Sequence, residues 1–218
     1  MDRILEPELM DDERQSIAYA KADFSVSNQL FVDSLIRDFP DHLRRIVDIG
    51  CGPGDVMVRL ARTVPTVDIT AVDGSAPMLA LAQDTVRSAA LDARIRLIQG
   101  YLPGLPLEEH LYDAILSKDL LHHLPDPLML WKEVARLGKR GAAVYVMDLV
   151  RPLAPSDARR IVDTVAASDD PILREDFYRS LCAAFTPAEV QEQLIASGLD
   201  LRVQRLSDRH MLVSGLLR

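Results

Sequence analysis

The stretch Arg45-Ile46-Val47-Asp48-Ile49-Gly50-Cys51-Gly52-Pro53-Gly54-Asp55 decides the fold of this 218-residue chain. A β-branched apolar run stops at Gly50, three glycines alternate, and an apolar pattern of helical period follows. This order predicts a strand, a tight turn and a helix. Glycine has no Cβ and tolerates positive φ, so a ligand can approach the backbone of such a turn closely. The start of the helix behind the turn favours polar ligand groups.

The segments that follow alternate between strand and helix patterns. Further strands are predicted at 68–72, 95–99, 112–116 and 142–147. Such alternation predicts a parallel sheet with helices on both faces. Ligands of these sheets bind at the carboxyl ends of the strands. Here those ends are Gly50, Asp73, Gly100, Ser117 and Asp148.

The pattern changes after residue 150. Two helices are predicted at 156–168 and 171–185, and a third follows the capping box that starts at Thr186. The segments 201–206 and 210–214 flank a Ser-Asp-Arg turn, so they are expected to pair antiparallel. The predicted fold class is therefore α/β: a Rossmann-like three-layer sandwich whose seven-stranded, mostly parallel sheet ends in an antiparallel hairpin.

Four parts are expected along the chain. Residues 1–40 form an N-terminal helical cover, with an arm at 1–12, a short helix near 13–22 and a second helix that ends before Pro40. Residues 41–150 form the ligand-binding core, 151–185 a helical insert or lid, and 186–218 the last helix and hairpin, which complete the core.

Composition narrows the class of protein. The formal net charge of −8 argues against nucleic acid as the main partner, because such proteins carry basic patches. No segment approaches the roughly 20 apolar residues of a membrane span, and the N-terminus does not read as a secretory signal. The two cysteines, Cys51 and Cys182, form neither a disulfide framework nor a metal-binding spacing, so a reducing cytoplasm is the expected compartment.

Over about residues 45–150 the chain resembles the class I S-adenosylmethionine-dependent methyltransferases. The resemblance rests on Val47-Asp48-Ile49-Gly50-Cys51-Gly52-Pro53-Gly54, on Ile69–Ser75 with its acid at the strand end, and on Tyr112–Ser117 followed by Leu121-His122-His123-Leu124. The last phrase is common in small-molecule and quinone-ring members of the family. The Gly141 turn and the terminal hairpin fit as well. The resemblance implies S-adenosyl-L-methionine as cofactor and a small-molecule methyl acceptor.

Cofactor contacts follow from this resemblance. Gly50, Cys51 and Gly52 would expose backbone to the amino-acid end of the cofactor, and Ser117 would lie near its methionine part. Asp48 would help to hold the turn and the ammonium group, often through water.

At the other end of the cofactor, Asp73 would accept hydrogen bonds from both ribose hydroxyls, because a carboxylate offers two acceptor oxygens. The segment after the third strand reads Gly-Tyr-Leu-Pro and lacks the acid that many members use for the adenine amino group. The remaining contacts expected for the ribose and adenine are Gly74, Met78, Gly100, Tyr101 and Leu102.

A nicotinamide-dependent dehydrogenase is the nearest rival interpretation. Its G-x-G-x-x-G turn would need glycine at position 55. Asp55 stands there instead and is a poor neighbour for a pyrophosphate. S-adenosylmethionine carries no phosphate, so Asp55 does not count against it.

Methyl transfer mainly requires alignment of the acceptor and exclusion of water. A base is needed only when the acceptor must lose a proton. His122 is the preferred candidate for that base, with local packing as the alternative. Asp119 lies near the same edge and could polarise an acceptor or cap a turn. Residues expected to line the acceptor pocket or its lid are Tyr19, Phe24, Asn28, Asp148, Arg174 and Tyr178.

Two other functions stay open from sequence. One is a non-catalytic partner protein that binds S-adenosylmethionine or S-adenosylhomocysteine. The other is methylation of protein or RNA, which the short chain and its acidity disfavour. The acceptor atom can be oxygen, nitrogen, sulfur or carbon, and the protein can be a monomer or a homodimer. No metal is expected.

Overall fold

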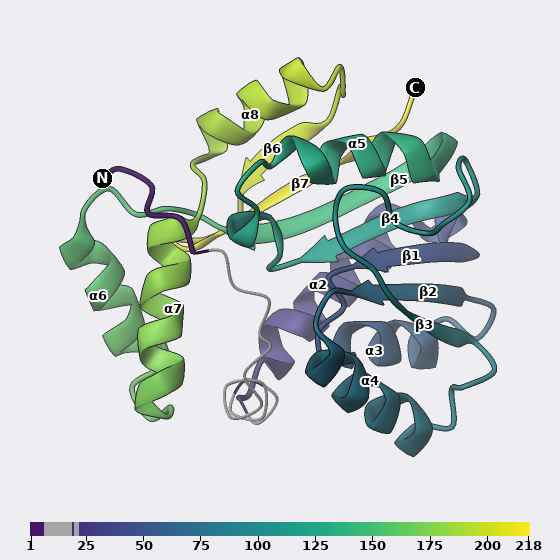
Figure 1. Ribbon diagram of the computed structural model, residues 1–218, viewed down its shortest axis with the longest axis horizontal. Coiled ribbons are helices and arrows are strands. Elements are labelled where there is room, and N and C mark those ends of the chain that lie inside the picture. The colour runs from purple at the N-terminus through teal and green to yellow at the C-terminus, as the bar shows by residue number, and fades with distance from the viewer. Residues whose placement is uncertain (7–18, 20–21) are drawn as a thin grey trace.

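The structure, a computed structural model, describes residues 1–6, 19 and 22–218 (Figure 1). Most of the predicted arm at 1–12 and of the short helix at 13–22 lies outside these residues. Within the described part, seven strands form one sheet in the order β3-β2-β1-β4-β5-β7-β6. The strands are β1 (Arg45–Ile49), β2 (Asp68–Asp73), β3 (Ile95–Gln99), β4 (Tyr112–Lys118), β5 (Gly138–Leu149), β6 (Arg202–Arg205) and β7 (His210–Leu216).

The pairing of these strands confirms the predicted fold class. Strands β1 to β5 run parallel to one another, whereas β7 is antiparallel to both β5 and β6. Strand β5 begins at Gly138, four residues before the predicted start, and continues through Gly141, which has a φ of +83°. The predicted turn at 139–141 is therefore an irregularity inside a longer strand.

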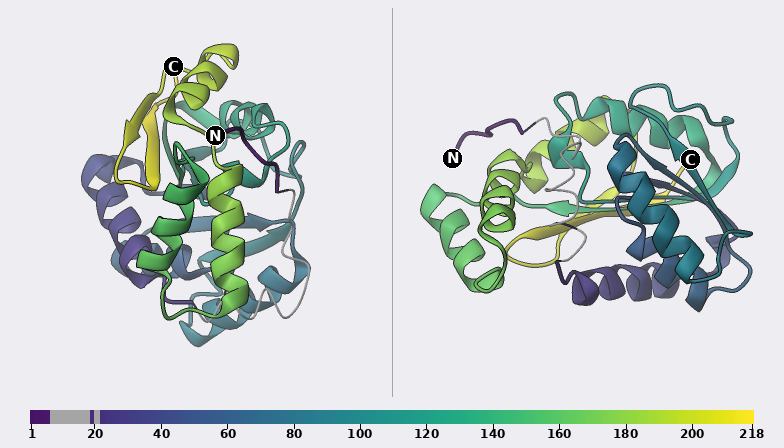
Figure 2. Two further views of the ribbon diagram at one scale, coloured as in Figure 1. Left: turned by 90° about the vertical axis from the view of Figure 1, so that its left-hand side faces the viewer. Right: turned by 60° about the horizontal axis from the view of Figure 1, so that its bottom comes forward.

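Helices cover both faces of the sheet, as Figures 1 and 2 show. One face carries α2 (Ser25–Asp38), α3 (Asp55–Thr63) and α4 (Ala76–Ser88), and the other carries α5 (Leu128–Leu137) and α8 (Pro187–Ala196). The last two are joined by a buried hydrogen bond from Trp131 Nε1 to Gln193 Oε1 of 2.9 Å. The predicted capping box of α8 is present between Thr186 and Glu189.

Helices α6 (Pro155–Val165) and α7 (Pro171–Ala183) stand apart from these layers, beyond the carboxyl end of β5 (Figure 1). They pack on each other around a small apolar cluster that includes Ile161, Val162 and Leu181. Short 3₁₀ turns occur at η1 (Pro40–His42) and η2 (Leu121–His123). No helix among the described residues is long and apolar enough to cross a bilayer.

Side chains alternate between the two faces of β1, as a period of two requires. Ile46 belongs to the core under α2, α3 and α4, whereas Val47 and Ile49 belong to the core under α5 and α8. Asp48 has the parity of Ile46, so its carboxyl group lies on the α3 side of the sheet, next to the glycine turn.

Three glycines of the turn have a left-handed backbone conformation: Gly50, Gly52 and Gly54, with φ values of +79°, +51° and +89°. The amides of Gly50 and Cys51 both donate to the carbonyl oxygen of Val72, at 2.8 and 3.0 Å. These bonds tie the end of β1 to the end of β2. The strand–turn–helix prediction is thus confirmed, and the turn lies at the carboxyl edge of the sheet.

The turn generates a prediction about stability. An L-residue in a left-handed conformation costs about 1–2 kcal/mol, so Gly50→Ala and Gly141→Ala should both lower the free energy of unfolding. A Cβ at Gly50 would lie 3.0 Å from Leu120 side-chain atoms, whereas a Cβ at Gly141 would meet nothing within 4 Å. Urea unfolding followed by circular dichroism should therefore show a loss larger by about 1 kcal/mol for Gly50→Ala, the cost of a modest steric clash. Equal losses for the two variants would contradict this role of Leu120.

Candidate functional site

Two adjoining pockets open at the carboxyl ends of β1, β2 and β4. The helix pocket, of about 600 Å³, lies against α2, α3 and the glycine turn. The loop pocket, of about 440 Å³, lies against the loops that follow β2, β3 and β4. Residues that line both pockets are Tyr19, Gly50, Gly52, Lys118 and Asp119.

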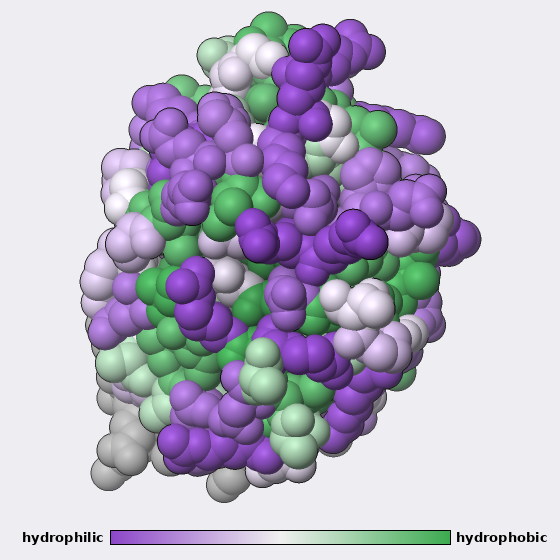
Figure 3. All heavy atoms as spheres, turned by 90° about the vertical axis from the view of Figure 1, so that its right-hand side faces the viewer, coloured by the Kyte–Doolittle hydropathy of each residue, from purple (hydrophilic) through white to green (hydrophobic). Residues whose placement is uncertain are grey.

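The opposite edge of the sheet, at the amino ends of the strands, has a different surface. Viewed toward the amino ends of the strands, its surface is mostly hydrophilic (Figure 3). A hollow of about 440 Å³ at those amino ends is lined by charged side chains such as Arg45, Asp68 and Arg96. The predicted binding edge and this edge therefore lie on opposite sides of the sheet.

Most of the residues predicted for the cofactor, the acceptor or the lid line one of the two carboxyl-edge pockets. The helix pocket receives Tyr19, Phe24, Asn28, Asp48, Gly50, Cys51 and Gly52. The loop pocket receives Asp73, Gly74, Met78, Gly100, Tyr101 and Leu102. The five predicted residues that line neither pocket are Ser117, His122, Asp148, Arg174 and Tyr178.

Asp73 is the link between the turn and the loop pocket. Its Oδ2 accepts a hydrogen bond of 2.8 Å from the Gly52 amide, and its Oδ1 accepts one of 2.9 Å from the Ser75 amide. The two amides fix the plane of the carboxylate at the end of β2. A carboxylate has about four acceptor positions, so an oriented one can serve two neighbouring hydroxyl groups of a ligand.

Asp48 lies on the wall of the helix pocket and is 3% exposed. Burial, together with the negative charge of Asp73, raises the pKa of Asp48 to about 7, although Lys118 opposes the rise. A cationic group that entered this pocket would favour the ionised carboxylate. The position thus suits an ammonium group of a ligand.

Cys51 lies at the tip of the turn, and its thiol is not activated as a nucleophile. Its side chain is buried, and burial with the nearby Asp48 raises the pKa of the thiol well above its ordinary value. Cys51 and Cys182 are both buried and free. What Cys51 offers the site is its backbone at the rim of the helix pocket.

The outer wall of the helix pocket ties α2 to α3. Asn28 Nδ2 donates to Asp55 Oδ2 at 2.8 Å, and Arg59 Nε donates to the same oxygen at 2.6 Å. Asp55 thus holds α2, part of the N-terminal cover, against the core. In the sequence it served only as an argument against a pyrophosphate ligand. Across the pocket, the rings of Tyr19 and Phe24 pack with centroids 4.8 Å apart.

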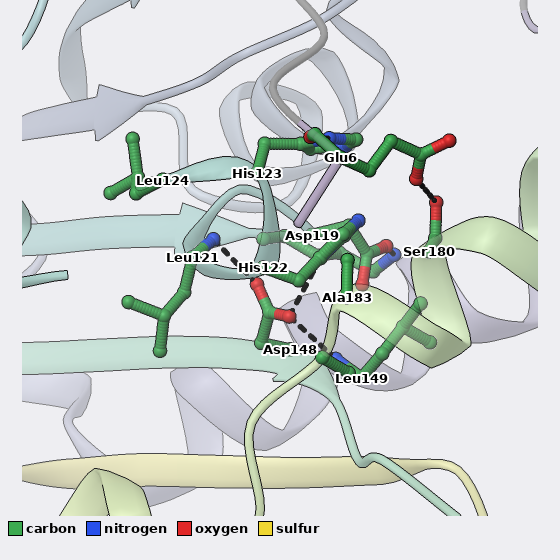
Figure 4. Close-up of polar contacts among 12 residues, drawn as sticks. Glu6, Asp119, Leu121, His122, His123, Leu124, Asp148, Leu149, Ser180 and Ala183 are labelled. Atoms are coloured by element: carbon green, nitrogen blue, oxygen red, sulfur yellow. Dashed lines mark hydrogen bonds and ion pairs between the residues drawn. The ribbon is translucent and has the colours of Figure 1, made fainter. Parts of the chain in front are cut away.

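The two histidines of η2 have different surroundings. His122 is buried, and its Nδ1 lies 2.7 Å from Asp148 Oδ1 (Figure 4). Burial opposes the change, but the Asp148 carboxylate raises the pKa of His122 above its usual value. Asp148 also accepts hydrogen bonds from the amides of Leu121 and Leu149, at 2.7 and 2.8 Å. The pair therefore anchors η2 to the end of β5.

His123, rather than His122, lines the loop pocket. Burial and the charge of His122 lower the pKa of His123 to about 3, so its imidazole is neutral near pH 7. The two rings pack with centroids 4.0 Å apart. His122, the candidate preferred from the sequence as the base, is the buried member of the pair. A sequence pattern does not show which way a 3₁₀ turn faces, so it could not distinguish the two histidines.

Three other predicted residues make contacts within the fold. Ser117 Oγ is buried and donates to the carbonyl oxygen of Ile49 at 2.8 Å, which joins β4 to β1. Arg174 pairs with Asp163 at 2.6 Å, between α7 and α6. The Tyr178 ring lies under the guanidinium of Arg159, 3.9 Å from its carbon. The next residue after Ser117, Lys118, is the one that reaches the pockets.

Lys118 and Asp119 were not in the set predicted for the cofactor, yet they stand where the two pockets meet. Their side chains form an ion pair and are 8% and 19% exposed. The alternation of β4 could have identified Lys118, since neighbouring residues of a strand point to opposite faces. In the described part of the chain, no group of three or more His, Cys, Asp or Glu side chains is placed to bind a metal ion.

The buried Asp48 generates a pH prediction. An acid whose pKa is higher in the folded protein stabilises that protein only below its unfolded pKa, and this contribution is lost as the pH rises through the folded value. A rise from 3.8 to about 7 corresponds to roughly 4 kcal/mol. Asp48→Asn should therefore gain stability relative to the unsubstituted protein as the pH rises from about 4 to about 7, and no more above that.

The measurement is the free energy of urea unfolding of both proteins between pH 4 and pH 8. The difference between the two cancels the titration of the groups they share. Parallel curves across this range would contradict a raised pKa for Asp48.

Comparison with known proteins identifies the central segment. A family described as "Methyltransferase domain" matches residues 46–141. Curated relatives include a demethylmenaquinone methyltransferase of Porphyromonas gingivalis, 30% identical over 121 residues, or 55% of this chain and 49% of the relative. Another from Lactiplantibacillus plantarum is 31% identical over 111 residues, which cover 50% of this chain and 47% of the relative. The chain thus spans about half the length of the curated relatives it matches.

Solved structures match over nearly the whole chain. A putative S-adenosylmethionine-dependent methyltransferase of Methanococcus maripaludis has a TM-score of 0.75 at 21% identity and covers 99% of this chain and 97% of its own. A methyltransferase of Aquifex aeolicus has a TM-score of 0.69 at 18% identity, with coverage of 95% and 99%. At these identities the likeness concerns the fold. Residues 46–141 thus match a methyltransferase domain, and the chain has the fold of the class I S-adenosylmethionine-dependent methyltransferases.

Proposed function

We propose that this chain is an S-adenosylmethionine-dependent methyltransferase that acts on a small-molecule acceptor. The observation that carries the proposal is the oriented Asp73 carboxylate, held by the Gly52 amide at the edge of a glycine turn. In a fold of this kind, an acid in that position can bind the ribose of the cofactor while the turn binds its amino-acid end. The buried Asp48 beside the turn supports the same assignment.

The residues present fit the chemical groups of S-adenosylmethionine. Asp48 suits the ammonium group, and Asp73 suits the two ribose hydroxyls. Met78 and Leu102 offer apolar contact for the adenine in the loop pocket. Gly100 keeps this pocket open, because a Cβ there would lie 3.1 Å from Leu105 and 3.2 Å from Val72. When bound, the cofactor supplies a methyl group attached to a positively charged sulfur.

The protein's part in the reaction is to bind, orient and exclude water. The turn and Asp73 fix the cofactor at the carboxyl edge. Tyr19 and Phe24 cover the helix pocket from the N-terminal side. The His122–Asp148 pair holds η2, so that His123 and Leu124 keep their place on the wall of the loop pocket.

The acceptor is not carried over from the relatives. The printed names of the curated relatives concern demethylmenaquinone, but those matches cover half of each relative. The family match ends at residue 141, before α6 and α7. We infer only the class of the acceptor: a small molecule rather than a nucleic acid or a protein.

The proposal predicts that Asp73→Asn loses most of its affinity for S-adenosylhomocysteine. A charged hydrogen bond contributes about 1.5–3 kcal/mol, so the dissociation constant should rise at least about tenfold. Isothermal titration calorimetry measures this directly. Asp68→Asn is the matched control, because Asp68 begins the strand that Asp73 ends and lies at the opposite edge. Unchanged affinity in a folded Asp73→Asn protein would refute the assigned ribose contact.

A second experiment separates an enzyme from a non-catalytic binding protein. The protein is incubated with S-adenosylmethionine carrying a radioactive methyl group and with a panel of small phenols, hydroquinones, amines and thiols. Methyl transfer to any of them supports the enzyme. Tight binding of the cofactor without transfer across a broad panel would favour the binding protein.

A further inference from the structure

Asp119 lies at the junction of the two pockets, and the hydrogen bonding of its carboxyl group is unusual. One of its oxygens pairs with Lys118, but the other, Oδ1, is buried and has no hydrogen-bond partner among the residues that the structure describes. A buried oxygen without a partner costs about 1–3 kcal/mol. Such groups are rare in folded proteins and call for an explanation.

The backbone of Asp119 is also strained. Its φ is +57°, in the left-handed region, and its amide donates to the carbonyl oxygen of Met147 at 2.9 Å. Left-handed residues other than glycine occur often at ligand-binding sites, where the surrounding structure holds them. Here the conformation turns the chain directly after β4 and leaves the carboxyl group beside both pockets.

The surroundings of Asp119 define what its free oxygen can bind. The ammonium of Lys118 already supplies one full positive charge to this carboxylate. His122 of the following 3₁₀ turn and Asp148 at the end of β5 lie on the same side of the site (Figure 4). An anion would meet the carboxylate itself. A group that carries an N–H or O–H is the partner that suits Oδ1.

We propose that Asp119 is a catalytic residue that receives the methyl acceptor: its Oδ1 accepts a hydrogen bond from the N–H or O–H group whose nitrogen or oxygen takes the methyl group. This inference rests on the proposed function. It assigns an acceptor that carries a proton on its nucleophilic atom, a hydroxyl or an amine. It excludes an acceptor that arrives as an anion.

The step balances with this assignment. The acceptor's lone pair forms a bond to the methyl carbon, while the carbon–sulfur bond breaks and leaves its electron pair on sulfur. The acceptor atom has then gained a positive charge: a methylated hydroxyl is a strong acid, whereas a methylated amine is an ammonium. The proton of a methylated hydroxyl passes to Asp119 Oδ1 and then to water, whereas the ammonium keeps its hydrogen bond to Oδ1 and loses its proton to water. The positive charge of the sulfur thus leaves as the released proton, and the carboxylate is ionised again.

The charges around Asp119 favour its ionised form before the reaction. Burial alone would raise its pKa, but Lys118 and His210 outweigh this and lower it. A carboxylate of low pKa still suffices for a hydroxyl acceptor, because an oxygen that has just been methylated is a far stronger acid than a carboxylic acid. For an amine acceptor, Oδ1 only orients the nitrogen. The ion pair with Lys118 therefore orients Asp119 without preventing proton transfer.

The test uses two ligands that differ at the position of the methyl group. S-adenosylhomocysteine lacks the methyl group, whereas sinefungin carries an amine there. If Oδ1 faces that position, Asp119→Asn should weaken sinefungin about tenfold, the effect of losing a charged hydrogen bond. The affinity for S-adenosylhomocysteine should change less than twofold. Calorimetry measures both.

Two further variants keep the test decisive. Asp119→Gly removes the carboxyl group and also accepts the left-handed backbone, so it replaces Asp119→Asn if the latter is unstable. Asp169→Asn is the charge control, because Asp169 lies on the exposed surface between α6 and α7. It should leave both affinities unchanged.

The outcomes separate this inference from the proposed function. Equal losses for both ligands would place Asp119 on the cofactor and overturn the inference, as would no loss for either. Failure of the unsubstituted protein to bind S-adenosylhomocysteine would instead refute the proposed function. Turnover with a hydroquinone or with a primary amine distinguishes the two classes of acceptor, and Asp119→Asn should lower the rate at least about tenfold on whichever reacts.

Discussion

The hydrogen bond from the Gly52 amide to Asp73 Oδ2, 2.8 Å long, joins the two strand ends on which the site is built. It is possible only because the turn is left-handed at Gly50, Gly52 and Gly54. The same turn directs two more amides to the carbonyl oxygen of Val72. The ends of β1 and β2 therefore form one rigid rim, and a pocket lies on each side of it. Gly50 and Gly52 line both pockets, so a side chain at either position would lie beside both.

The charges at this rim follow from the same arrangement. Asp48, Asp73 and Asp119 all line the pockets. Asp119 forms an ion pair with Lys118 and its pKa is lowered, whereas the pKa of the buried Asp48 is raised. A partly buried site that is rich in carboxylates disfavours a phosphate group and favours a ligand with positive charge. S-adenosylmethionine carries two such charges, an ammonium and a sulfonium, so the electrostatics agree with the fold.

Local patterns predicted the strands, the glycine turn, the capping box and the closing hairpin, because each depends on residues close in sequence. The pocket walls required tertiary information. Ser117 and Lys118 are neighbours, yet one bonds to β1 and the other reaches the pockets. For His122 and His123, the bond to Asp148 decides which is buried, 26 residues away in sequence. Arg174 likewise forms an ion pair with Asp163 of α6, a contact between helices that its sequence position does not reveal.

Two distant residues hold the loop that carries His123. From one side, Asp148 binds the Leu121 amide and the His122 ring. From the other, the Arg3 guanidinium donates to the carbonyl oxygens of His122 and Leu124, at 2.9 and 3.0 Å. Arg3 and α7 lie outside the segment matched by the family. The glycine turn and Asp73 thus lie inside the matched segment, whereas Arg3 and Asp148, which support the η2 loop, lie outside it. The wall of the loop pocket therefore depends on contacts between the matched segment and the rest of the chain.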